Sequence, residues 1–129
     1  MKEKLIFVVD DDRLIQHFLE YTLIGREGCS VKVFSKAEDC IKNLDKNPDY
    51  IILDHYFLGT EENLMTGLEA LHKIREVNKD VQVIILSNNQ DKELINSYLK
   101  EGVTSFVVKE GFFINKLFDI FNELLPQLT

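Results

Sequence analysis

Short apolar runs alternate with longer amphipathic segments along the chain, and each kind predicts a different element. Five runs have the length and the β-branched or aromatic content of strands: residues 5–9, 30–34, 50–54, 81–86 and 105–108. The runs at 5–9 and 50–54 hold consecutive apolar residues, which predicts strands covered on both faces. Residues 30–34 alternate instead, as in a short strand near a sheet edge.

The segments between these runs carry apolar residues every three or four positions, as on one face of a helix. The predicted helices begin near Asp12, Ser35, Gly67, Asp91 and Phe113 and end near Leu23, Leu44, Val77, Gly102 and Leu125. Asp12 can cap the first helix, and Ser35 with Glu38 has the pattern of a capping box. The spacing predicts these inward residues: Leu14, Ile15, Phe18, Leu19 and Thr22 in the first helix, Leu68, Ala70, Leu71, Ile74 and Val77 in the third, and Leu94, Ile95, Tyr98 and Leu99 in the fourth.

Strands that alternate with helices predict an α/β fold, a doubly wound parallel sheet of five strands. With the flavodoxin-like strand order 2-1-3-4-5, the first and third strands lie side by side. Asp10 and Asp11 end the first of these strands and Asp54 ends the other. We therefore expect the three carboxylates to meet at the carboxyl edge of the sheet, where ligands bind in such folds.

Composition limits the classes of function. The 129 residues predict one domain, residues 1–129, without an output domain. The net charge of −7 argues against non-specific binding to nucleic acid or to anionic membranes. The first apolar run is too short for a signal peptide or a membrane span, so we expect a cytoplasmic protein. Cys29 and Cys40 lack CxxC spacing and are expected to be free thiols.

Carboxylates that converge in one pocket repel each other unless a cation lies between them. Mg²⁺ is a hard cation that takes oxygen ligands from carboxylates, water and phosphate. A carboxylate beside it, such as Asp54, could act as a nucleophile on phosphorus. Ser87 follows the fourth predicted strand and Lys109 follows the fifth. Lys109 could neutralise the charge of the phosphoryl oxygens, and the Ser87 hydroxyl could donate a hydrogen bond to them.

Four strand ends together resemble the receiver domain of two-component response regulators, over the whole chain. The matching motifs are Val8-Val9-Asp10-Asp11-Asp12, Ile52-Leu53-Asp54, Ile84-Ile85-Leu86-Ser87 and Phe106-Val107-Val108-Lys109. By this resemblance Asp54 is the phosphoacceptor, and Asp10, Asp11, Asp54 and the backbone carbonyl of Tyr56 hold Mg²⁺. Ser87 and Lys109 contact the phosphoryl group, and Ser87 and Phe106 form the switch.

The resemblance also implies partners. The phosphoryl donor is a phosphohistidine on a sensor histidine kinase or on a histidine phosphotransfer protein. Signalling runs through phosphorylation-dependent binding of a downstream target protein to the face built by the fourth helix, fifth strand and fifth helix. The domain modifies itself and is not a turnover enzyme. The last helix has an apolar stripe wider than one packing face needs, which predicts core packing or a homodimer.

Two alternatives stay open at this point. A degenerate receiver would bind partners without phosphorylation, if the long segment after Asp54 covers it. A small aspartyl-phosphate phosphatase would need a second acid two residues after the nucleophile, where this chain has Tyr56. At single positions, His55 is expected to be a solvated loop residue, and Phe106 could simply be core. Glu110 stands where the family has proline after Lys109, and we predict a trans peptide bond there.

Overall fold

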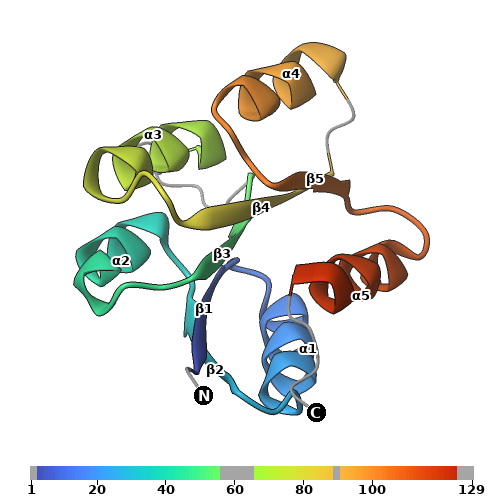
Figure 1. The fold of residues 1–129 in the computed structure, drawn as a ribbon. Helices are drawn as coiled ribbons and strands as arrows, with labels where there is room; N and C mark the ends of the chain where they lie inside the picture. The colour runs from blue at the N-terminus through green and yellow to red at the C-terminus, as the bar shows by residue number, and fades with distance from the viewer. Residues whose placement is uncertain (1–2, 56–65, 89–90, 125–129) are drawn as a thin grey trace.

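A computed structural model describes residues 3–55, 66–88 and 91–124 (Figure 1). The strands are β1 (Lys4–Val9), β2 (Cys29–Phe34), β3 (Tyr50–Asp54), β4 (Gln82–Ser87) and β5 (Ser105–Val108). The helices are α1 (Arg13–Ile24), α2 (Ala37–Lys42), α3 (Gly67–Val77), α4 (Lys92–Lys100) and α5 (Phe113–Leu124), and a 3₁₀ turn, η1 (Leu44–Lys46), follows α2. Each predicted element is present in this part of the chain.

The strands form one parallel sheet in the order β2-β1-β3-β4-β5, which confirms the predicted flavodoxin-like topology. β2 lies at an edge, as its alternating pattern indicated, and β5 forms the other edge. In the register between β1 and β3, Val9 lies opposite Leu53. The residues that follow, Asp10 and Asp54, are therefore brought to neighbouring positions at the carboxyl edge.

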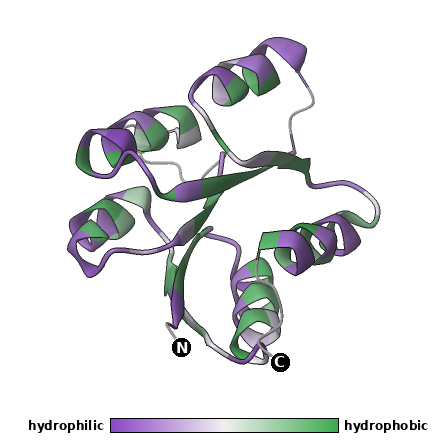
Figure 2. Ribbon diagram, in the orientation of Figure 1, coloured by the Kyte–Doolittle hydropathy of each residue, from purple (hydrophilic) through white to green (hydrophobic). Residues whose placement is uncertain are grey.

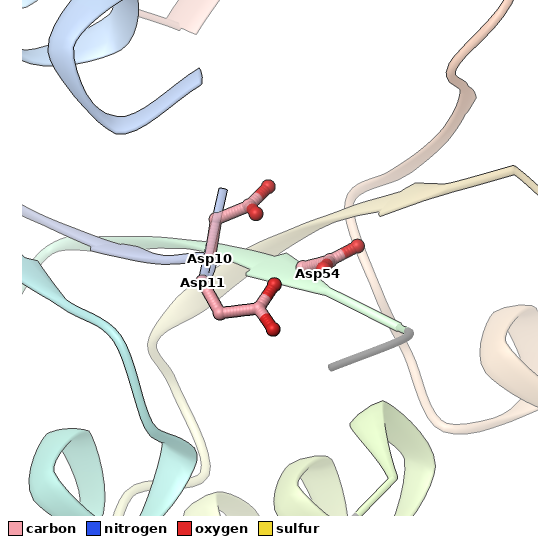
Figure 3. A group of neighbouring side chains, drawn as sticks. All are labelled: Asp10, Asp11 and Asp54. Carbon is pink, nitrogen blue, oxygen red and sulfur yellow. The ribbon is translucent and has the colours of Figure 1, made fainter. Parts of the chain in front are cut away.

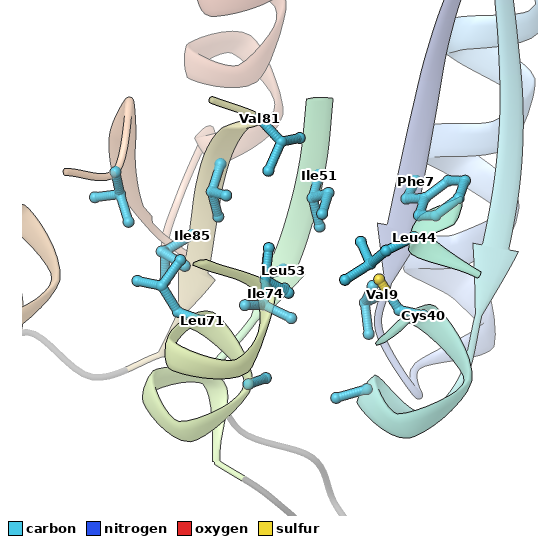
Figure 4. Close-up of a cluster of buried hydrophobic side chains, with 14 of the residues drawn as sticks. Phe7, Val9, Cys40, Leu44, Ile51, Leu53, Leu71, Ile74, Val81 and Ile85 are labelled. Carbon is cyan, nitrogen blue, oxygen red and sulfur yellow. The ribbon is translucent and has the colours of Figure 1, made fainter. Parts of the chain in front are cut away.

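Helices cover both faces of the sheet (Figure 1), and a separate hydrophobic cluster fills each side. Side chains alternate between the faces along β1 and β3, so Phe7, Val9, Ile51 and Leu53 belong to the cluster under α2, α3 and α4. Figure 4 shows this cluster in close-up. The intervening residues pack with α1 and α5 on the opposite face. Hydropathy follows the same division, with hydrophobic strands at the centre of the fold (Figure 2).

Helix α1 is rotated relative to its predicted orientation. Asp12 caps it as expected, since its carboxylate accepts hydrogen bonds from the backbone N–H groups of Leu14 and Ile15. The buried residues are Gln16, Leu19 and Leu23, whereas Leu14 is 78% and Phe18 41% exposed. The apolar residues of this helix cover more than one face, and the face that turns inward includes Gln16, which hydrogen-bonds to Asp10 and Ser35.

Four further expectations, on helix faces, a cap and a helix end, are wrong. Val77 and Leu99 lie largely exposed, at helix positions beyond the edge of the packed stripe. The capping box at Ser35 is absent because the N-cap of α2 is Lys36, which makes no side-chain cap hydrogen bond. The Ser35 hydroxyl accepts a hydrogen bond from the Gln16 amide instead, at 3.0 Å. Helix α2 ends at Lys42, and the predicted extension to Leu44 becomes the 3₁₀ turn.

The expectations for the cysteines and for the peptide bond after Lys109 are confirmed. Cys29 and Cys40 are free thiols. No peptide bond is cis among the residues that the structure describes, so the bond between Lys109 and Glu110 is trans as predicted. None of the described helices is long and apolar enough to cross a membrane. In α5 the apolar stripe packs largely on the sheet: Leu117 and Phe121 are buried, and Phe113, Ile114, Phe118, Ile120 and Leu124 are partly buried. The homodimer through this helix stays a prediction.

Candidate functional site

The carboxyl edge of the sheet brings together side chains that are far apart in the sequence. Asp10 and Asp11 directly follow β1, and Asp54 is the last residue of β3 (Figure 3). Ser87 is the last residue of β4, and Lys109 directly follows β5. Parallel strands all end at the same edge, so the topology itself gathers these groups.

Lys109 joins two of the carboxylates. Its ammonium nitrogen lies 3.0 Å from Asp10 Oδ2 and 3.0 Å from Asp54 Oδ1. The Asp10 and Asp54 side chains are buried, and only 10% of the Lys109 side chain is exposed. Charge-assisted hydrogen bonds of this kind are strong when water is excluded. The cation is therefore held directly beside the carboxylate that ends β3.

The three carboxylates form a compact group. One oxygen from each of Asp10, Asp11 and Asp54 lies within 4.8 Å of the others. Among the described residues, the buried Oδ1 of Asp11 has no hydrogen-bond partner. A buried polar atom without a partner is costly, and a hard divalent cation with oxygen ligands would satisfy it. The donor set thus fits a Mg²⁺ ion, as expected from the sequence.

Burial and charge act on the titrating groups in opposite directions. Burial raises the pKa of Asp10, although the Asp12 backbone N–H and Lys109 favour its ionised form. Burial alone would lower the pKa of Lys109, but Asp54 and Asp10 outweigh it and raise that pKa. One ammonium group faces three carboxylates here, so the site carries excess negative charge when all are ionised. This excess favours binding of a further cation.

Gln16 supports the acidic pair and was missed by the sequence reasoning. Its side-chain amide is buried and donates hydrogen bonds to the backbone carbonyl of Asp10 and to the Ser35 hydroxyl. Asp10 Oδ1 in turn accepts a hydrogen bond from the backbone N–H of Asp12, at 2.9 Å. Asp10 is thereby fixed from both its backbone and its side chain. The available signal was a polar residue one turn after the N-cap, in the helix that follows the acidic cluster.

The prediction for His55 is wrong. The side chain is 8% exposed, and its Nδ1 is hydrogen-bonded to the Tyr98 hydroxyl. His55 continues the pairing of β3, because its backbone N–H donates to Leu86 O at 2.8 Å. Alternation along an extended strand then turns it to the same face as Leu53, under α4. Burial lowers the pKa of His55, which favours the neutral imidazole.

The remaining predicted residues have these positions. Ser87 is fully buried, and its carbonyl accepts a hydrogen bond from the Lys109 backbone N–H at 2.7 Å, which joins the ends of β4 and β5. Phe106 is half-buried, and its ring centroid lies 5.6 Å from that of Tyr98. Tyr56 lies outside the described residues, so the role of its backbone carbonyl as a Mg²⁺ ligand stays a prediction.

Comparison with known proteins agrees with this arrangement. The family model of the response regulator receiver domain matches residues 6–121. The chain belongs to this family. Receiver domains are signalling modules that take phosphate from histidine kinases and signal to downstream effectors, and they bind Mg²⁺ at an acidic pocket.

The relatives of this receiver include longer proteins. It is 27% identical over 110 residues to a probable C4-dicarboxylate response regulator DctR of Bacillus subtilis, covering 84% of this chain and 46% of that protein. It is 28% identical over 110 residues to the DNA-binding transcriptional regulator NtrC of Escherichia coli, covering 84% of this chain and 22% of that protein. The chain thus spans less than half the length of these relatives.

Solved structures show the same fold. The chemotaxis protein CheY4 of Vibrio cholerae superposes with a TM-score of 0.75 at 21% identity, covering 92% of this chain and 96% of that one. Because DNA-binding regulators are among the relatives, the expectation that this protein does not contact nucleic acid stays a prediction.

Proposed function

We propose that Asp54 accepts a phosphoryl group from a phosphohistidine of a sensor histidine kinase or a histidine phosphotransfer protein. The observation that carries the proposal is the contact of Lys109 with both Asp54 and Asp10 at 3.0 Å, inside a group of three carboxylates. An acceptor for phosphoryl transfer needs a well-positioned nucleophile and neutralisation of charge more than it needs acid–base groups. This edge of the sheet offers both.

In the proposed reaction, a carboxylate oxygen of Asp54 attacks phosphorus. The new O–P bond forms as the P–N bond to the donor histidine breaks, and the imidazole nitrogen keeps the electron pair and takes a proton from solvent. Lys109 lies where its ammonium group can pair with the transferred oxygens. Ser87, at the end of β4, is the proposed hydroxyl donor to the same group.

Asp10, Asp11 and Asp54 are the residues that would hold Mg²⁺, and the carbonyl of Tyr56 stays a prediction for the same ion. When bound, the ion supplies positive charge that offsets the negative charge of the carboxylates and of the phosphoryl oxygens. The Asp11 oxygen without a hydrogen-bond partner supports this assignment. Gln16 and the Asp12 backbone keep Asp10 oriented toward the group.

The signal is proposed to be a change in how a downstream target protein binds the face formed by α4, β5 and α5. The acyl phosphate carries about −1.5 to −2 charges at neutral pH, in place of the single negative charge of the free carboxylate, and its three oxygens are new hydrogen-bond acceptors that can reorganise nearby polar groups. Ser87 and Phe106 are the proposed switch residues. The domain would modify itself without being a turnover enzyme, and its action as a stand-alone receiver in the cytoplasm stays a prediction.

Intact mass after incubation with acetyl phosphate tests the proposal. We expect the wild type to gain one phosphoryl group when Mg²⁺ is present and not when it is chelated. Asp54→Asn should gain none, whereas the matched change at an exposed carboxylate, Asp119→Asn on α5, should leave the gain intact. No gain in the wild type would contradict acceptance from small donors and favour the degenerate receiver, which binds partners unmodified.

A further inference from the structure

A continuous set of contacts runs from the proposed acceptor to the proposed switch aromatic. His55 follows Asp54 directly in the chain and is hydrogen-bonded through Nδ1 to the Tyr98 hydroxyl. The ring of Tyr98 then contacts Phe106, with centroids 5.6 Å apart. Tyr98 belongs to α4, so these contacts join β3, α4 and β5.

The Tyr98 side chain is held through its hydroxyl by His55 and through its ring by Phe106. Its side chain is fully buried, and its ring lies edge-on to the His55 ring, with centroids 5.5 Å apart. Burial raises the pKa of Tyr98, and the negative charge of Asp54 raises it further, so the hydroxyl keeps its proton. A buried hydroxyl that loses its partner costs more than an exposed one. Separation of the Tyr98 hydroxyl from His55 would therefore be costly.

The backbone of His55 is tied to the structure beside the acceptor. Its N–H donates to Leu86 O at 2.8 Å, and its carbonyl accepts from Gly67 N at 3.0 Å, at the start of α3. Gly67 also provides the space for the contact. A Cβ at that position would lie 2.5 Å from the Tyr98 hydroxyl oxygen and 2.7 Å from His55 Cα. The close approach of His55 and Tyr98 thus depends on a residue without a side chain.

We propose that Tyr98 is a positioning residue that couples the acceptor end of β3 to α4 and Phe106 through its hydrogen bond to His55. The role of Tyr98 in signalling rests on the proposed function. In that role, Tyr98 provides a second route, besides Ser87, by which a change at Asp54 reaches the α4–β5 face. Its physical basis is independent of phosphorylation, because the contacts exist in the unmodified protein. Removal of the hydroxyl alone should break the route while the ring keeps filling the core.

Hydrogen exchange of α4 tests the coupling in a double-mutant cycle. The four proteins are the wild type, Asp54→Asn, Tyr98→Phe and the double variant, each measured by mass spectrometry without a phosphodonor. Tyr98→Phe should speed exchange of the α4 amides about fivefold, which corresponds to one hydrogen bond of typical net strength. Asp54→Asn should change α4 exchange in the wild-type background and much less in the Tyr98→Phe background.

Tyr50→Phe is the matched control. The Tyr50 hydroxyl is also in a mostly buried setting, donating to Leu124 O at 2.8 Å, but it belongs to the cluster on the opposite face. This change should leave both α4 exchange and its response to Asp54→Asn unaltered. If the role of Tyr98 were purely structural, Tyr98→Phe would speed exchange of the α4 amides, but Asp54→Asn would have the same effect on that exchange in both backgrounds.

Two results would overturn the inference: equal effects of Asp54→Asn in both backgrounds, or α4 exchange that Tyr98→Phe does not change. Intact mass of the wild type with acetyl phosphate reports the proposed function separately. A protein that gains no phosphoryl group but shows the non-additive cycle would retain the coupling and lose the proposed acceptor role. A protein that gains a phosphoryl group but shows an additive double-mutant cycle would support the acceptor role of Asp54 and overturn the coupling through Tyr98.

Discussion

The ammonium group of Lys109, directly after β5, lies 3.0 Å from the carboxylate of Asp54 at the end of β3, although β4 separates the two strands. The contact spans 55 positions of sequence. It requires β4 to lie between β3 and β5, as it does in the predicted strand order. The pair is therefore a direct product of the topology.

Lys109→Met should impair phosphorylation more than any change at the surface. The variant keeps an unbranched side chain but removes the charge beside Asp54, so we expect the rate of mass gain from acetyl phosphate to fall roughly 100-fold. Without Mg²⁺ the free energy of unfolding should fall by about 3 kcal/mol, because two buried carboxylates lose their cation. Lys100→Met, at the exposed end of α4, is the control. An unchanged rate would remove Lys109 from the site.

Mg²⁺ should stabilise the folded protein through Asp11. At ten times its dissociation constant the ion adds about 1.4 kcal/mol to the free energy of unfolding, or roughly 5 °C in melting temperature. Asp11→Ala should abolish this gain and, in the absence of Mg²⁺, be at least as stable as the wild type, since it removes a buried oxygen without a hydrogen-bond partner. Melting curves with and without Mg²⁺ measure both effects. Asp119→Ala should keep the full gain.

Gly67→Ala should destabilise the protein although alanine is the better helix former. The added Cβ would lie 2.7 Å from His55 Cα, a backbone atom that cannot move aside, so we expect a loss of about 2 kcal/mol. Gly25→Ala is the matched control, because its φ of −67° is ordinary and its nearest neighbours are 3.6 Å away. Urea unfolding of both variants makes the comparison. Equal stabilities would show that α3 shifts freely away from His55.

Stability should decline in alkali through Cys40. Burial raises the pKa of its thiol from 9.0 to about 12, so the unfolded chain releases this proton at lower pH than the folded protein. The contribution is complete below pH 9 and is lost as the pH rises toward 12. By pH 10 the wild type should lose roughly 1.4 kcal/mol more than Cys40→Ala, relative to pH 8. If the free energies of unfolding of the two proteins fell in parallel with pH, the Cys40 thiol would ionise equally well in the folded protein, which would contradict the prediction.

The fold could be predicted because each strand has a recognisable run and a polar end. The acidic residues after Val9 and Leu53, with Lys109 after β5, define the site once the strand order is known. Alternation of strands and helices predicts a doubly wound sheet, and 2-1-3-4-5 is one of the common orders of such sheets. Asp12 also acts as the predicted cap. The strands, the polar residues at their ends and the cap at Asp12 can each be predicted from a short stretch of sequence.

The details that failed depend on contacts between distant segments. The inward face of α1 includes Gln16, whose partners lie after β1 and β2, so helical spacing alone could not choose between the apolar faces of this helix. The same contact occupies the Ser35 hydroxyl and removes the capping box. His55 was misassigned because β3 pairs for one residue beyond its apolar run. Its partner Tyr98, 43 positions away, cannot be identified from either local pattern.

The most direct test of the central claim locates the phosphoryl group itself. Borohydride reduces an acyl phosphate on aspartate to homoserine, and peptide mass spectrometry after treatment with acetyl phosphate and Mg²⁺ then identifies the modified position. The proposed chemistry predicts homoserine at position 54 and at no other aspartate. Homoserine at position 10 or 11, or full retention of Asp54 in a protein that has gained phosphoryl mass, would contradict it.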